Sequence, residues 1–71
     1  MAVSYSRLWK VLIDKKMSRA EMRKKAKLAP NTLTKLIRDE EVSLDVLSRI
    51  CHLLGTDFGE IVEYIDEETD K

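Results

Sequence analysis

The sequence predicts an all-α fold, a compact bundle of five helices. Apolar residues recur at helical spacing in several separate stretches of the 71-residue chain. Pro30 and Gly55 occupy positions typical of a helix start and a helix end. No segment shows the alternating pattern of a β-strand. We therefore expect one domain over residues 1–65, followed by an acidic C-terminal tail over residues 66–71.

The first two helices are predicted over residues 4–15 and 19–26. One face of the first carries the residues Tyr5, Leu8, Trp9, Leu12 and Ile13. Its two aromatic residues follow the same period, which indicates packing in the core and not stacking on bases. The second helix begins with a capping box, in which Ser18 and Glu21 each satisfy a free backbone N–H. Because its apolar face is thin, this helix must be held by what it packs against.

The third and fourth helices follow a short connection and an acidic loop. Pro30 opens the third, residues 30–38, whose buried stripe is Leu33, Leu36 and Ile37. Residues 39–42 break the pattern and form the loop. Ser43 caps the fourth helix, which ends at Gly55. One apolar face of this helix carries Leu44, Leu47, Ile50, Cys51 and Leu54.

A short fifth helix is predicted to start at a second capping box, formed by Asp57 and Glu60. One side of it carries the residues Phe58, Ile61, Val62 and Ile65. This stripe either closes the core of the monomer or, with Tyr64 extending the apolar patch, contacts a second copy. We therefore predict a homodimer whose interface includes Val62, Tyr64 and Ile65.

Charge divides the chain although its net charge is zero. Residues 1–38 carry eleven Lys and Arg and two acids, a net charge of +9, whereas residues 39–71 carry two basic residues and eleven acids, a net charge of −9. Such asymmetry indicates that one surface meets a polyanion. The acidic half is a solubilising face, a contact surface for a basic partner protein, or a surface that keeps DNA away from that side.

Several function classes find no support in the sequence. The single Cys cannot form an internal disulfide, and with one His it gives no zinc-ligand set. Cys51 and His52 are adjacent, so they point about 100° apart on a helix, and no third group orients them for nucleophilic catalysis. No apolar run approaches the roughly 18 residues of a membrane span. We expect a cytoplasmic protein with no cofactor, no metal, no membrane partner and no enzymatic activity.

The central signal is a pair of short helices joined by the three residues Lys27, Leu28 and Ala29. So short a connection forces the helices to cross steeply, which lets the first lie over a DNA backbone while the second enters the major groove. The outer face of the second carries Asn31, Thr34 and Lys35, whose donors, acceptors and methyl group suit base edges. The basic run of residues 23–27, Lys27 included, favours phosphate contact, and the alternative for it is a solvated helix face. The alternative for Asn31, Thr34 and Lys35 is that they face only solvent.

Five short motifs follow one another in the chain: Ser18-x-x-Glu21-Met22, Ala26-x-Leu28, Asn31-Thr32-Leu33-Thr34-Lys35-Leu36, Ser43-Leu44-x-x-Leu47 and Leu53-Leu54-Gly55-Thr56. This ordered set resembles the Xre family, which includes the phage Cro and repressor proteins, over about residues 5–65. The resemblance implies a lambda-repressor-like fold, a prokaryotic or phage-encoded protein, a homodimer, and double-stranded DNA as the partner.

The resemblance also implies roles for individual residues. Asn31, Thr34 and Lys35 match positions that face the groove and contact bases. Arg19, Thr32 and Arg38 match positions near phosphates, where they would position the protein without reading sequence. The acidic residues of the loop after the third helix, Asp39, Glu40 and Glu41, would repel phosphates, so we expect no side-chain DNA contact from that loop.

Two positions depart from the family pattern. Lys27 stands in the turn where the family usually has Gly, and a left-handed conformation there would cost about 1–2 kcal/mol. Arg23 stands where a small Ala is common, so that either its side chain points outward or the two helices lie slightly apart.

The sequence thus predicts a sequence-specific double-stranded DNA-binding protein that regulates transcription, a repressor by resemblance. The alternative is a protein-interaction module of the same fold, antitoxin-like or an accessory subunit, that uses its acidic C-terminal half. The polar groove-facing set on the third helix favours DNA.

Overall fold

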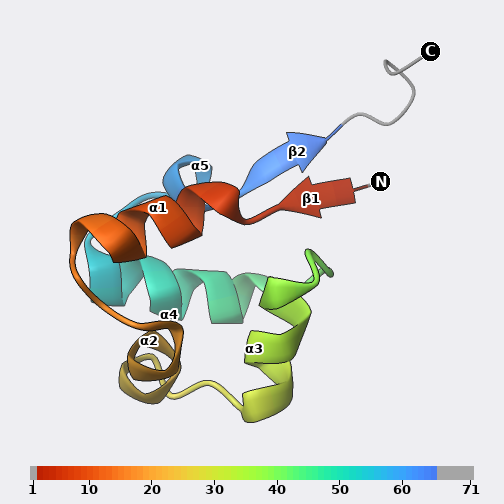
Figure 1. Ribbon diagram of the computed structural model, residues 1–71. Helices are drawn as coiled ribbons and strands as arrows, with labels where there is room; N and C mark the ends of the chain where they lie inside the picture. The colour runs from red at the N-terminus through yellow and green to blue at the C-terminus, as the bar shows by residue number, and fades with distance from the viewer. Residues whose placement is uncertain (1, 66–71) are drawn as a thin grey trace.

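The computed structural model describes residues 2–65 and confirms the fold of five helices around one core (Figure 1). The helices are α1 (Ser6–Asp14), α2 (Arg19–Lys25), α3 (Pro30–Ile37), α4 (Leu44–Leu54) and α5 (Phe58–Ile61). α1 begins two residues later than predicted, and α1, α2 and α3 each end one residue earlier. The predicted acidic tail, residues 66–71, lies outside the described residues.

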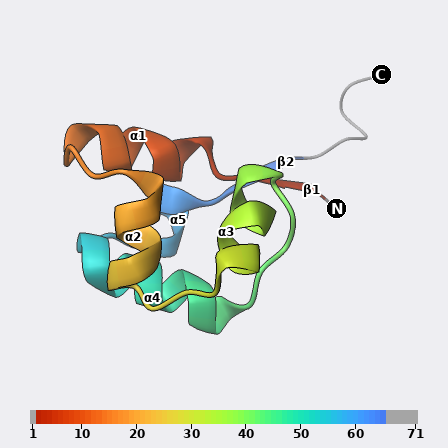
Figure 2. The same cartoon turned by 60° about the horizontal axis from the view of Figure 1, so that its bottom comes forward.

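The core gathers side chains from all five helices. Figure 2 shows α2 and α3 side by side, with α1 on one side of the pair and α4 on the other. The buried residues are Tyr5, Leu8, Leu12, Met22, Ala26, Leu28, Leu36, Leu47, Ile50, Leu54 and Ile61. Because α2 and α3 are short, their orientation depends on this shared core more than on their own helix propensity.

The predicted capping interactions at the starts of α2, α4 and α5 are present, with one difference in α2. The Ser18 hydroxyl accepts a hydrogen bond from the backbone N–H of Glu21 at 3.0 Å, and the Ser43 hydroxyl accepts one from Val46 at 3.2 Å. The capping box at the start of α5 is complete. In α2 the box is only half formed, because the Glu21 carboxylate pairs with Lys25 at 3.2 Å.

Four helices end on a residue in the left-handed backbone region. The residues and their φ angles are Lys16 at 55°, Lys27 at 60°, Asp39 at 58° and Gly55 at 66°. At each end the following N–H donates to a carbonyl five residues back, as Met17 does to Leu12 at 2.9 Å, and this bond satisfies an otherwise free carbonyl. Only Gly55 is suited to this backbone without a steric penalty.

A small antiparallel sheet was not predicted. β1 (Ala2–Ser4) pairs with β2 (Glu63–Ile65), and Val3 lies opposite Tyr64 (Figure 1). α5 ends at Ile61 and the backbone of Val62 is already extended, so the prediction that Val62 and Ile65 share a helix face is wrong. Strands of three residues are too short to show a period of two, and the two paired strands lie far apart in the sequence.

Several apolar residues assigned to the core are exposed. The exposed fraction is 74% for Ile13 and 70% for Leu44, and Ile37 and Phe58 are also exposed. The buried line of α1 runs from its N-cap, Tyr5, through Leu8 and Leu12, and Ile13 lies about 100° from the centre of that line. The predicted stripes were therefore wider than the faces that contact other helices.

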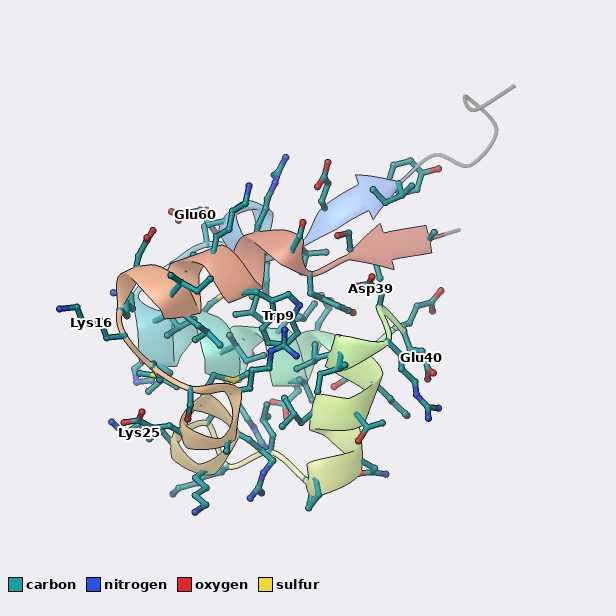
Figure 3. The ribbon with its side chains drawn as sticks, in the orientation of Figure 1. Trp9, Lys16, Lys25, Asp39, Glu40 and Glu60 are labelled. Atoms are coloured by element: carbon teal, nitrogen blue, oxygen red, sulfur yellow. The ribbon has the colours of Figure 1, made fainter. Side chains whose placement is uncertain are left out.

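The acidic loop after α3 fastens that helix to the start of α1. The Asp39 carboxylate accepts a hydrogen bond from the backbone N–H of Tyr5 at 3.1 Å, and the Tyr5 hydroxyl donates to the carbonyl of Glu40 at 2.7 Å. Figure 3 shows Asp39 at the side of the loop nearest α1. Asp39 thus has a structural contact that accounts for an acidic residue in this loop.

Replacing Tyr5 with Phe is expected to cost about 1 kcal/mol of unfolding free energy at neutral pH, because the Glu40 carbonyl loses its donor. Burial raises the pKa of the Tyr5 phenol above its ordinary value of 10.0. The stabilisation is therefore fully present below about pH 10 and is lost as the pH rises through the folded-state pKa. Urea unfolding of both proteins at pH 7 and pH 11 checks this. A difference between the two proteins that is the same at both pH values would contradict it.

Candidate nucleic-acid interface

The helix-turn-helix consists of α2, the turn of residues 26–29 and α3. Met22 is the one buried residue within α2, and Leu36 is the one within α3. Between them Ala26 and Leu28, in the turn, are also buried. These four apolar side chains anchor both helices in the core, and the outer face of α3 stays exposed.

The outer face of α3 brings together the predicted base-contacting residues. Asn31, Thr34, Lys35 and Arg38 are all exposed, and their positions fall within about 100° of arc on the side away from Leu36. The Thr34 hydroxyl donates to the carbonyl of Pro30 at 3.3 Å, so Thr34 offers outward an oxygen acceptor and a methyl group. The face thus presents an amide, an ammonium, a guanidinium and a methyl group, the groups that suit base edges and phosphates.

The predicted phosphate-contacting residues do not form one cluster. Arg38 lies at the end of α3 beside the residues predicted to contact bases, with a long ion pair of 4.0 Å to Glu40 that leaves both side chains exposed. Thr32 is half-buried on the flank of α3. Arg19 is the first residue of α2 and lies against the ring of Trp9.

The fourth predicted phosphate contact, Lys27, lies beside α4. With Lys25 it lines a depression of about 570 Å³ whose other wall carries Arg49 and His52. This depression lies between the C-terminal end of α2 and α4. No residue of α3 lines the depression, so Lys27 is not grouped there with the predicted base-contacting residues.

Two arginines hold the turn between α2 and α3. Arg23 is half-buried, and its guanidinium donates to the carbonyl of Leu28 at 3.2 Å. Its side chain folds back against the turn. Arg49 of α4 donates to the carbonyl of Lys27 at 3.2 Å and also pairs with Asp45 at 3.0 Å. The role of Arg49 was not predicted, because no local pattern in the sequence shows a contact across 22 residues.

The backbone of Lys27 is left-handed, as expected for a position where the family usually has Gly. Replacing Lys27 with Gly is expected to raise the unfolding free energy by about 0.5–1 kcal/mol, since the steric penalty is larger than the entropy Gly adds to the unfolded chain. Thermal unfolding should show an increase of about 2–8 °C in Tm. Lys16 has a similar φ at the end of α1, so Lys16→Gly should raise the Tm in the same way. A decrease in Tm for both variants would contradict the assignment of strain to these residues.

The remaining chemistry of the domain is sparse. Cys51 is half-buried on α4, where burial raises the pKa of its thiol, and the adjacent His52 is exposed. Within residues 2–65 there is no group of three His, Cys, Asp or Glu side chains placed to hold a metal ion. None of the helices in that range is long and apolar enough to cross a membrane.

Comparison with known proteins agrees with this geometry. The family model for the Cro/C1-type helix-turn-helix DNA-binding domain matches residues 7–67. Among solved structures, the chain is similar to the transcriptional regulator VanUg in its crystal form II, with 45% sequence identity and a TM-score of 0.90 over 93% of this chain and 88% of that one. A search of curated proteins finds no significant match. The helix-turn-helix and the extent of the family match show that the chain belongs to the Cro/C1-type family of helix-turn-helix DNA-binding domains.

Proposed function

We propose that the protein is a sequence-specific transcriptional repressor that reads double-stranded DNA with the outer face of α3 in the major groove. The observation that carries the proposal is the exposed set Asn31, Thr34 and Lys35, which α3 presents on one side while Leu36 fixes the other side to the core. The family match and the similarity to a transcriptional regulator support it. The protein is expected to act in the cytoplasm.

Base reading and phosphate binding are divided among these residues in the proposal. Asn31 and Lys35 carry the amide and ammonium groups that hydrogen-bond base edges, and Thr34 offers its methyl group to a thymine. Arg19 and Arg38 lie at the start of α2 and the end of α3, where they bind phosphates on either side of the groove. Thr32 supports them from the flank of α3. Lys27, which faces α4, contributes long-range attraction to DNA more than a direct contact.

The proposed repressor is a homodimer. Tyr64 is 63% exposed on β2, and the half-buried Val62, whose backbone is also extended, lies two residues earlier on the same side. Ile65 follows Tyr64 in the strand and points to the opposite face. An exposed aromatic residue beside an apolar neighbour suits a two-fold contact, in which the same patch meets itself. Two copies would place their α3 helices in successive major grooves, about one helical turn apart.

A second candidate function is a protein-interaction module that uses the acidic half of the chain. Residues 39–65 carry seven acids and one basic residue, which favours a basic partner. Asp39 and Asp45 already have partners within the domain, so part of this charge stabilises the fold itself.

Selection of bound sequences from a randomised duplex library, at about physiological salt, tests the proposal without a known operator. A repressor dimer should enrich an inverted repeat with half-sites spaced by about one helical turn. Enrichment of a single half-site would contradict the dimer and keep the DNA function. Weak, salt-sensitive binding without any enriched sequence would contradict sequence-specific recognition and favour the protein-interaction module.

A further inference from the structure

We propose that Trp9 is a positioning residue for DNA binding, because its indole ring holds the guanidinium of Arg19 in place for a DNA phosphate. The guanidinium carbon of Arg19 lies 4.3 Å from the centroid of the ring. This is well within the roughly 6 Å over which a cation is attracted to an aromatic face. The inference rests on the proposed function, since it assigns a partner to one of its phosphate contacts.

The turn between α1 and α2 creates this contact. Lys16 adopts the left-handed backbone, and the N–H of Met17 donates to the carbonyl of Leu12, which reverses the chain directly after α1. The first residue of α2, Arg19, is thereby returned to the side of α1 that carries Trp9. Figure 3 shows Trp9 projecting from α1 toward the side on which α2 and α3 lie.

Trp9 does not behave as an ordinary core residue. It is half-buried, whereas Leu8 on the same helix and Tyr5 at its N-cap are fully buried. Its ring borders a surface depression of about 190 Å³ at the junction of α1 and α2, which Ile13 and Arg19 also line. The prediction that Trp9 packs in the core therefore holds for one part of the ring. The other part remains at the surface beside Arg19.

The contact of Arg19 with an aromatic ring, in place of a carboxylate, leaves its guanidinium suited to phosphate binding. Arg7, Arg38 and Arg49 each lie within 4.0 Å of a carboxylate, whereas Arg19 forms no such ion pair among residues 2–65. A carboxylate neutralises the charge of its partner, but an aromatic face restrains the guanidinium and leaves the N–H groups at its edge free. The Arg19 guanidinium is thus restrained, charged and exposed at once, which is what a phosphate oxygen requires of its donor.

The test is a double-mutant cycle on DNA affinity. Trp9→Leu is expected to weaken binding to a duplex about two- to fivefold, the range that corresponds to an exposed cation–π contact, and Trp9→Phe should recover part of the loss. In an Arg19→Ala background, Trp9→Leu should have no further effect on affinity. Ile13→Ala, which alters the same depression without touching the cation–π pair, is the matched control and should bind as the wild type does.

The same variants separate positioning from mere stability. If Trp9 acted only by stabilising the fold, Trp9→Leu would weaken binding equally in both backgrounds, and that result would overturn the inference. Because Trp9 is the single tryptophan of the chain, its fluorescence spectrum is expected to change on DNA binding in the wild type and to change less in Arg19→Ala. If the wild type binds DNA and Trp9→Leu binds with the same affinity, the inference about Trp9 is overturned and the proposed function is not affected. Failure of the wild type to bind any duplex would instead contradict the proposed function, and the inference with it.

Discussion

Replacing Lys35 with Ala is expected to weaken binding to a selected duplex by about 1–3 kcal/mol, a loss of roughly 5- to 150-fold in affinity. Lys35 is exposed on the face of α3 that also carries Asn31, and a lysine in the major groove most often donates to the acceptors of guanine. The variant should also lose its preference at one base pair of the site. Fluorescence anisotropy titrations on the selected duplex and on single-base variants of it measure both effects.

Two further variants separate base reading from general electrostatic attraction. Lys10→Ala removes the same charge from the exposed side of α1 and should lower affinity only slightly, because that side does not face the DNA in the proposal. Arg19→Ala should weaken selected and random duplexes alike and reduce the slope of affinity against salt by about one ion. Equal losses on selected and random duplexes for Lys35→Ala would show that Lys35 does not read a base.

Replacing Met22 with Ala is expected to destabilise the domain by about 2–5 kcal/mol. Met22 is fully buried and is the one buried residue within the seven residues of α2, so its loss leaves a cavity and frees the helix that supports α3. In a 71-residue domain with a small core this is a large share of the total stability. Thermal unfolding followed by circular dichroism should show a decrease of more than about 8 °C in Tm.

Met22→Leu is the matched variant for this position. It keeps the volume and the apolar character of the side chain, and we expect a cost below about 1.5 kcal/mol. DNA affinity measured at a temperature where Met22→Leu is folded should equal that of the wild type. A similar loss of stability in both variants would mean that the flexible thioether itself, and not the filled volume, holds α2 in place.

The helices and their ends could be predicted because their determinants are local. Ser18, Ser43 and Asp57 satisfy N–H groups within three residues. The left-handed backbone of Lys27 was expected only through the resemblance to a family that usually has Gly at this position. The outer face of α3 was predictable from local determinants too, since helical spacing alone separates Lys35 from Leu36.

Contacts between distant segments could not be predicted. The pairing of β1 with β2 joins the two ends of the described chain, and the hydrogen bond from Arg49 to Lys27 crosses 22 residues. Neither leaves a local pattern in the sequence. The contact between Trp9 and Arg19 belongs to the same class, because it depends on how the turn after α1 directs α2. The width of a buried face also depends on neighbouring helices, which is why Ile13 was wrongly assigned to the core.

NMR chemical shifts of the backbone amides and of the Trp9 indole N–H, followed during titration with duplex DNA, show directly whether α3 and the start of α2 form the DNA-binding surface. We expect the largest changes on Arg19, on residues 31–38 and on the Trp9 indole, and little change in α4, α5 and β2. Changes concentrated on residues 39–65, or none at low salt, would contradict it and favour a protein partner for the acidic half.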